Sequence, residues 1–338
     1  MSSTASPRAE ARTILIIVAI VQFVIGGWFS WSASHAAPRD LPVLVVSAPG
    51  SDQLAERLLA SAPGAYEVKD VATVEDADAA LRERDAYGAL LPTAGGGLEL
   101  HLASAASPTV AQTLTGRAQA LAAGPVRVTD VVPADPDDPH GAGLSMGFLP
   151  LLITAVIAGL LFVLKVRSAA AKLMGIVGFA VVSGLLSSLM LTHLSGVLPG
   201  DYLVNAGIIA LLELAMVGVI TGLGSLIGPP GIAVGAVLMF VIGNPLSGLA
   251  SAPEMLPQPL GTLGQFLPAG AAAGLLRTIG PFDGAGAGGP VLVLVAWALI
   301  GLALLWASSR RKPAGPPQGA ARDSAPAGEP RPATASAH

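Results

Sequence analysis

Long apolar runs recur along this chain and set its predicted architecture. Residues 13–34, TILIIVAIVQFVIGGWFSWSAS, carry no charge and are long enough to cross a hydrocarbon core of about 30 Å. Trp28 and Trp31 lie near the end of this run, where indole rings favour the membrane interface. The pattern predicts a retained membrane helix; a signal peptide cleaved near Ser34 and Ala36 is the alternative. Further spans are predicted at 144–164, 173–197, 203–227, 232–249 and 291–307.

Residues 35–143 have a different pattern, in which short apolar strands alternate with amphipathic helices. The order βαβαββαβ indicates a small α/β domain. The fold class is therefore an α-helical polytopic membrane protein with six transmembrane helices and a small extracytoplasmic α/β domain between helices 1 and 2. The predicted strands are 41–49, 66–72, 87–93, 98–104 and 126–134, and the predicted helices are 51–62, 73–85 and 108–123.

Basic residues of the short connections gather on one side of this predicted membrane. The turn at 199–202 has none, and the loop at 250–289 has only Arg277. By the positive-inside rule both termini are cytoplasmic, so 1–12 is a cytoplasmic N-terminus and 308–338, rich in Pro, Ala, Gly and Ser, is a disordered cytoplasmic tail. The topology-setting residues are Arg8, Arg12, Lys165, Arg167, Lys172, Arg310, Arg311 and Lys312.

Composition agrees with a membrane protein and excludes several kinds of chemistry. Of 338 residues, 52% are hydrophobic and 12% are charged, against about 25% charged in a soluble domain. The chain has no cysteine, which excludes disulfides, thiolate metal sites and thiol catalysis. Its abundant Ala, Gly and Pro suggest a GC-rich genome, and we expect the plasma membrane of a bacterium.

Motifs for catalysis, cofactors or metals are not found, and no enzyme activity, cofactor or nucleic-acid partner is expected. No G-x-x-x-x-G-K-[ST] or H-E-x-x-H occurs, so an ATPase that drives transport would be another chain. His101 has acidic residues near it and is interpreted as a surface residue, with a ligand role as the alternative.

Glu213 is the strongest single candidate for a functional residue, because it lies near the middle of the fourth predicted span. A charged side chain at the centre of a membrane helix costs about 2.5–3.5 kcal/mol on insertion scales. A functional interpretation is a proton-coupling or gating site. The structural alternative is a hydrogen bond to a neighbouring helix, for instance to Ser187 or Thr192.

Proline and glycine interrupt the apolar pattern between 243 and 282. Gly243, Asn244 and Pro245 lie within the fifth run and suggest non-helical backbone, which is tolerated at membrane depth only where protein or a water-filled cavity covers it. Residues 263–279 are apolar but interrupted by Pro268. We expect 250–282 to be a re-entrant or interfacial segment at the outer face, with a plain loop as the alternative.

The motifs of this region resemble those of ABC-2 type permeases, and more closely those of their Pip-like (phage infection protein) relatives. They are GNPLSG (243–248), PEMLP (253–257) and GQFLPAGA (264–271). The resemblance implies short re-entrant helices before the last span, a separate ATP-binding-cassette ATPase and a dimer of membrane halves. Asn244, Pro245, Pro268 and Glu213 are the candidate transport or gating residues.

Small residues at helical spacing support close helix packing. They serve either the packing of a single bundle or a homodimer interface. These residues are Gly175, Gly178, Ser183, Gly184, Ser187, Ser188, Gly218, Gly222, Gly224, Gly228, Gly231 and Gly235.

Two functional hypotheses follow from these patterns. The first is a permease subunit of an ABC-2-like export system, with a lipid-like or amphipathic substrate and a separate ATPase. The second is a non-transporting envelope protein, a Pip-like receptor or scaffold, whose outer domain binds a partner. A proton-coupled carrier that uses Glu213 is a further alternative.

Overall fold

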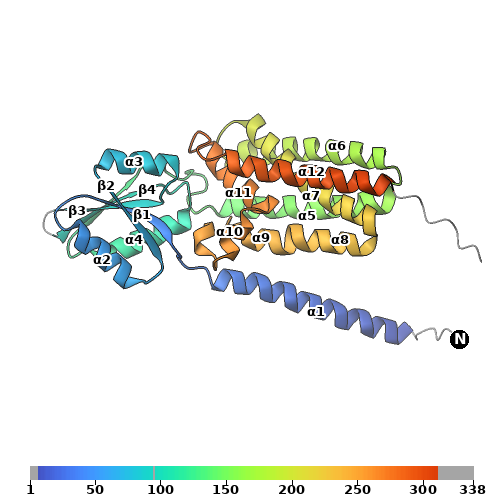
Figure 1. The fold of residues 1–338 in the computed structure, drawn as a ribbon, viewed down its shortest axis with the longest axis horizontal. Helices are drawn as coiled ribbons and strands as arrows, with labels where there is room; N and C mark the ends of the chain where they lie inside the picture. Colours follow the sequence, from blue (N-terminus) through green and yellow to red (C-terminus); the bar gives the residue numbers. More distant parts are fainter. Residues whose placement is uncertain (1–6, 94–95, 311–338) are drawn as a thin grey trace, which may run out of the picture.

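The computed structural model describes residues 7–93 and 96–310 and consists of a helix bundle and a small sheet domain (Figure 1). Among these residues, six helices are long and apolar enough to cross a membrane, as predicted. Arg311, Lys312 and the predicted tail after them lie outside the described residues. The six helices are α1 (Pro7–Ser34), α5 (Ala142–Lys165), α6 (Ala169–Ser188) with the π-helical turn η2 (Leu189–Leu194), α7 (Tyr202–Ile227), α8 (Pro229–Ala236) with η3 (Val237–Ile242) and α9 (Gly243–Leu246), and α12 (Gly288–Arg310).

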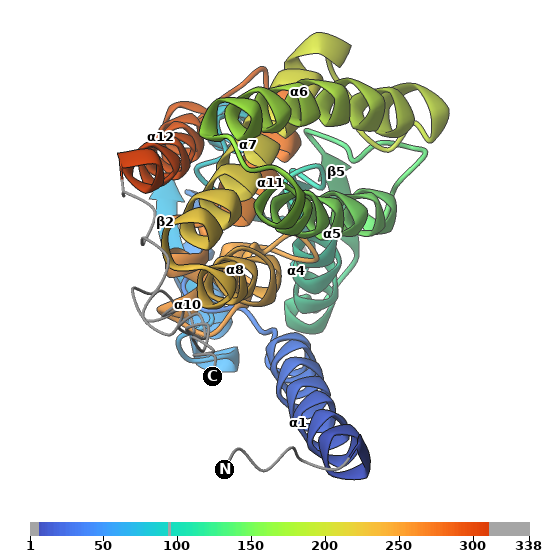
Figure 2. The ribbon, with the colours of Figure 1, turned by 90° about the vertical axis from the view of Figure 1, so that its right-hand side faces the viewer.

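Helix α7 is the centre of the bundle. Its sequence is apolar on every side, a pattern typical of a helix surrounded by other helices. Helices α5, α6, α8 and α12 pack around it (Figure 2). Helix α1 instead stands apart, with most of its apolar side chains exposed, and it contacts the bundle near its C-terminal end, at Trp28 and Phe29.

Glycines set the closest helix contacts in the bundle. A Cβ atom added to Gly301 of α12 would lie 2.6 Å from the backbone carbon of Gly218 on α7. One added to Gly184 of α6 would lie 2.4 Å from the carbonyl oxygen of Ala206. Most of the small residues at helical spacing thus pack against other parts of the same chain. A homodimer would have to form through other surfaces, such as α1.

The sheet domain has the predicted order βαβαββαβ. The strands are arranged β2-β1-β3-β4-β5, with β1, β2 and β3 parallel, β3 and β4 antiparallel, and β4 and β5 parallel. Its elements are β1 (Leu41–Val46), α2 (Ser51–Ser61), β2 (Tyr66–Val71), α3 (Val74–Glu83), β3 (Gly88–Pro92), β4 (Leu98–Leu102), α4 (Pro108–Leu121) and β5 (Val126–Asp130).

Helices cover both faces of this sheet. Alternate residues of β1 point to opposite faces, so Leu41, Val43 and Val45 pack with α2 and α4 while Leu44 and Val46 pack with α3. Each of the two cores also contains residues from far along the chain. Ala252 and Met255 belong to the core under α2 and α4, and Phe282 belongs to the core under α3.

These distant residues belong to the junction segment (residues 250–286), which connects the bundle to α12 at the sheet-domain end. It contains η4 (Pro253–Met255), α10 (Leu260–Gly264) and α11 (Pro268–Ile279). Backbone amides of Ala37 and Arg39 donate to the carbonyls of Met255 and Glu254 at 2.8 and 2.9 Å. The junction segment therefore lies between the sheet domain and the bundle and contacts both.

Replacing Gly301 with alanine is expected to lower the stability of the bundle, because the new methyl group overlaps the α7 backbone. Overpacking of this kind costs about 1–3 kcal/mol. Thermal unfolding of the purified full chain in detergent measures the effect. Gly178→Ala is the matched control, since its Cβ would have nothing within 4 Å. Equal melting temperatures for the two variants would contradict the packing of α7 against α12.

Candidate functional site

The helix that contains Asn244 and Pro245 is continuous, so the predicted break at this point is wrong. Residues Pro229–Leu246 form one apolar helix, with a π-helical turn just before Gly243. Pro245 has no N–H and cannot donate to the carbonyl of Val241 four residues earlier. The indole Nε1 of Trp28 donates to that carbonyl at 2.9 Å, so a donor from α1 replaces the missing one.

Beyond Leu246 the backbone is irregular as far as η4, and residues 247–249 and 251–252 are buried. Pro268 is the first residue of α11, a position where its lack of N–H costs nothing. Nearly all of α11 is buried, and it packs against α7 and α12. The predicted helical segment is thus present, and a plain loop is wrong. Its depth relative to a membrane stays a prediction.

Two cavities adjoin this irregular segment. The first, here called the cleft, is about 470 Å³, mostly apolar, and lies between α1, α5 and residues 244–251. Asn244 and Pro245 line it, together with Phe29 and Leu149. The second, here called the chamber, is about 310 Å³ and more polar, and lies between the sheet domain and the junction segment. Ser247 lines both cavities, so the backbone next to it is the partition between them.

Arg277 of α11 holds this partition in place. Its Nη1 donates to the carbonyls of Gly248 and Ser251, each at 3.1 Å, and its Nη2 donates to the carbonyl of Leu249. Gln265 adds a bond from its Nε2 to the carbonyl of Ser247 at 3.2 Å. Side chains from α10–α11 thus bind carbonyls of the irregular backbone, of which only Gly248 also accepts from a backbone amide nearby, that of Ser251 at 3.1 Å.

Arg84 and Tyr87 of the sheet domain complete the chamber wall. Arg84 donates to the carbonyl of Gly274 at 3.4 Å and to the hydroxyl of Thr278, both on α11. Tyr87 donates its hydroxyl to Glu254 at 2.8 Å. Burial, with the carboxylate of Glu254 as the next cause, raises the pKa of Tyr87 far above its usual range, so the phenol stays a donor.

Sequence reasoning missed this group of residues. Arg277 was noticed only as the single basic residue of its loop, and Arg84 is one of several charges in a surface helix. One local sign is structural: Arg84 has φ 65°, a left-handed conformation that a residue other than glycine seldom adopts.

Glu213 is fully buried on α7 and lies apart from both cavities. Ser183 of α6 donates to its Oε1 at 3.2 Å, so neither Ser187 nor Thr192 is the partner. Its Oε2 has no hydrogen-bond partner among the described residues. The predicted kind of bond, to a serine of a neighbouring helix, is therefore present, and its donor lies one helical turn before Ser187. Sequence alone does not fix how α6 is placed along α7.

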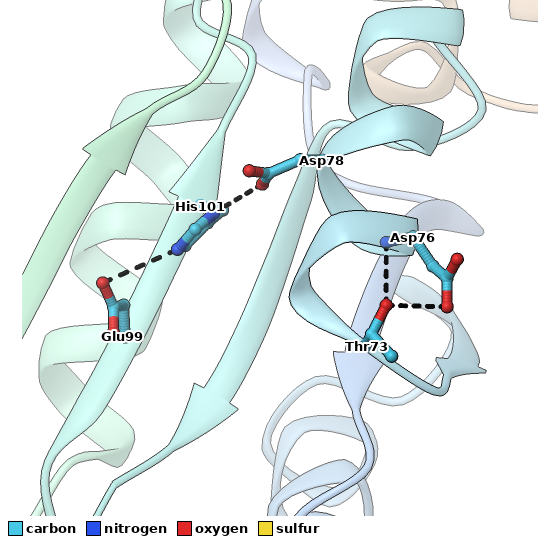
Figure 3. A network of polar contacts seen from close by, with 5 residues as sticks. All are labelled: Thr73, Asp76, Asp78, Glu99 and His101. Atoms are coloured by element: carbon cyan, nitrogen blue, oxygen red, sulfur yellow. Dashed lines mark hydrogen bonds and ion pairs between the residues drawn. The ribbon is translucent and has the colours of Figure 1, made fainter.

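His101 is buried, so its interpretation as a surface residue is wrong. Its Nδ1 lies 2.6 Å from Asp78 Oδ1 on α3, and its Nε2 lies 3.6 Å from Glu99 on its own strand (Figure 3). In the same figure Thr73 caps α3 by accepting from the amide of Asp76. The histidine therefore fastens α3 to β4, a structural role on the sheet face away from α2 and α4.

The predicted topology residues that the structure describes lie at the ends of the helices away from the sheet domain (Figure 1). Arg8 and Arg12 are at the start of α1, Lys165 ends α5, and Arg310 ends α12. Lys172 is not a loop residue: it is buried, and its Nζ donates to Ser225 at 2.7 Å. Arg167 is exposed in the connection between α5 and α6.

Comparison with family models, curated proteins and solved structures gave no match.

Trp28→Phe is expected to destabilise the full chain, because it leaves the carbonyl of Val241 without its donor. An unpaired buried acceptor costs about 1–3 kcal/mol. Pro245→Ala in the same chain restores an N–H for that carbonyl and should recover part of the loss in melting temperature. Trp31→Phe is the control, because it makes the same replacement at the neighbouring indole that stacks on Trp28 and does not remove the Trp28 donor. Independent, additive effects of the Trp28 and Pro245 changes would contradict this pairing.

Glu213→Gln is expected to melt at the same temperature as the natural chain or higher, because glutamine keeps an acceptor for Ser183 and carries no charge. Glu213→Leu loses the bond and should melt lower, by an amount that corresponds to about 0.6 kcal/mol. If the glutamine variant is as unstable as the leucine variant, the carboxyl group itself is required and the structural interpretation is wrong.

Proposed function

We propose that this chain is the membrane-spanning permease subunit of an ABC-2-like export system for amphipathic molecules, and that it works with a separate ATPase. The observation that carries the proposal is the pair of cavities on either side of residues 247–251. An apolar cleft beside α1 and a polar chamber under the sheet domain suit the two ends of one amphipathic molecule. The motifs that resemble ABC-2 permeases lie in this same part of the chain.

The proposal includes an orientation in the membrane. Basic residues lie at the bundle end away from the sheet domain, which by the positive-inside rule faces the cytoplasm. The sheet domain and the junction segment then lie on the extracytoplasmic side of a bacterial plasma membrane, and the N-terminus lies inside. The partition held by Arg277 is then near the outer surface, where a substrate would leave the bilayer.

A second candidate is an envelope receptor or scaffold whose sheet domain binds a partner. The observation that favours it is the connection between α5 and α6, which is only residues 166–168. Such a short turn leaves no room there for the cytoplasmic coupling helix that engages an ATPase in ABC-2 permeases. The sheet domain also has an open hollow of about 530 Å³ beside α4, lined by Gln112, Gln119 and His140.

Affinity purification of the tagged full chain from its native membrane in mild detergent distinguishes the two. The permease proposal expects an ATP-binding-cassette protein in near-equal amount, bound at the end of the bundle that carries Arg167. Arg167→Glu should then release it, while Arg57→Glu, an equal charge reversal on the exposed face of α2, should not. Recovery of the chain without an ATPase, or with envelope proteins instead, would favour the receptor.

A further inference from the structure

Two guanidinium groups of the chamber wall have only neutral partners. Arg84 donates to one carbonyl and one hydroxyl, and its guanidinium carbon lies 5.3 Å from the centre of the Phe282 ring. Arg277 donates to three carbonyls. Neither forms an ion pair with a carboxylate in the part of the chain that the structure describes. Arginine stays charged at any physiological pH, so both charges persist.

The carboxylates near the chamber offset only part of its positive charge. Glu254 lines the chamber, where it accepts the hydroxyl of Tyr87, and its one negative charge stands against two guanidinium groups. Glu83 and Asp85 flank Arg84 in the chain and are exposed at the rim, where solvent screens them. Asp138 lies behind Arg277, away from the chamber, and accepts the amides of Gly143 and Leu144 at the start of α5.

Two guanidinium groups that are withdrawn from water beside a single carboxylate leave one positive charge without a counter-charge, so this arrangement suits an anion. Donors for it are present. A guanidinium has five N–H groups, and Arg84 uses only Nη1 in its bonds to α11. Arg84 is the left-handed C-cap of α3, and its bonds to α11 hold its side chain in the chamber wall.

The cleft provides an apolar environment next to the chamber, on the other side of residues 247–251. Ser247 lines both cavities, and the cleft lining includes Phe29 of α1, Leu149 of α5 and Leu256 of the junction segment. A volume of about 470 Å³ is within the range of ligand pockets. Positive charge in one cavity and apolar lining in the other are complementary to a molecule with a charged head and a hydrocarbon chain.

We infer that the chamber binds the anionic head group of a membrane amphiphile whose apolar chain lies in the cleft, and that Arg84 and Arg277 are the head-group donors. The claim that this amphiphile is the exported substrate rests on the proposed function. The claim that the amphiphile binds concerns the purified chain alone.

Lipid binding by the purified full chain tests this inference. Native mass spectrometry measures the bound lipid while the chain is titrated with phosphatidylglycerol or with zwitterionic phosphatidylcholine. Phosphatidylglycerol should bind more tightly, and Arg84→Gly should weaken it about tenfold or more. Glycine accepts the left-handed backbone, so this variant is expected to fold. Arg277→Lys keeps the charge and should reduce binding less. Arg57→Gln, which removes an exposed charge of the same domain, should leave binding unchanged.

A second arm separates the head group from the chain. Ala33→Trp fills the cleft from α1 and should weaken phosphatidylglycerol binding while leaving soluble glycerol phosphate unaffected. Equal binding of both lipids, or no loss in Arg84→Gly, would overturn the inference. Glycerol phosphate that binds as tightly as the lipid would overturn the role of the cleft. No ATPase enters this assay, so a failure here is distinct from a failure to recover an ATPase partner.

Discussion

Carbonyl groups that a broken helix leaves free must find donors when water cannot reach them, and much of this structure depends on that requirement. Side chains from distant elements supply the donors. Trp28 binds the carbonyl opposite Pro245, Trp297 of α12 binds the carbonyl of Phe266 at 2.7 Å, and Arg277 binds three carbonyls between 248 and 251. Bonds from α1, α11 and α12 therefore hold this backbone in place.

The same requirement explains why proline and glycine are concentrated in one stretch. Proline removes donors, and glycine allows another backbone to come close. A Cβ on Gly264 would lie 1.8 Å from the carbonyl oxygen of Leu246, and one on Gly270 would lie 2.2 Å from that of Gly264. Close backbone contact is what lets three short helices fit at the end of the bundle, and it places polar cavities beside apolar ones.

Local pattern was sufficient for the elements and insufficient for the site. The six long helices and the order βαβαββαβ follow from run length, alternation and turn residues, all of which are local in the chain. The chamber is built from Arg84 and Tyr87 on one side and Glu254 and Arg277 on the other, pairs separated by 167 or more positions. Glu213 was recognised as buried, but its partner depended on the relative placement of two helices. Asn244 and Pro245 were recognised by composition, yet the helix continues through them because Trp28 supplies a donor.

The shared cores of the sheet domain have a consequence for how the protein is made. Ala252, Met255 and Phe282 belong to the two cores, yet they are synthesised more than a hundred residues after β5. During translation the strands and helices of this domain emerge well before those residues exist. Part of its apolar interior therefore stays uncovered until the junction segment has been made and packs against it. Completion of the sheet domain is thereby coupled to the folding of the helix bundle, because the residues that close its two cores follow the bundle helices α5 to α9 in the chain.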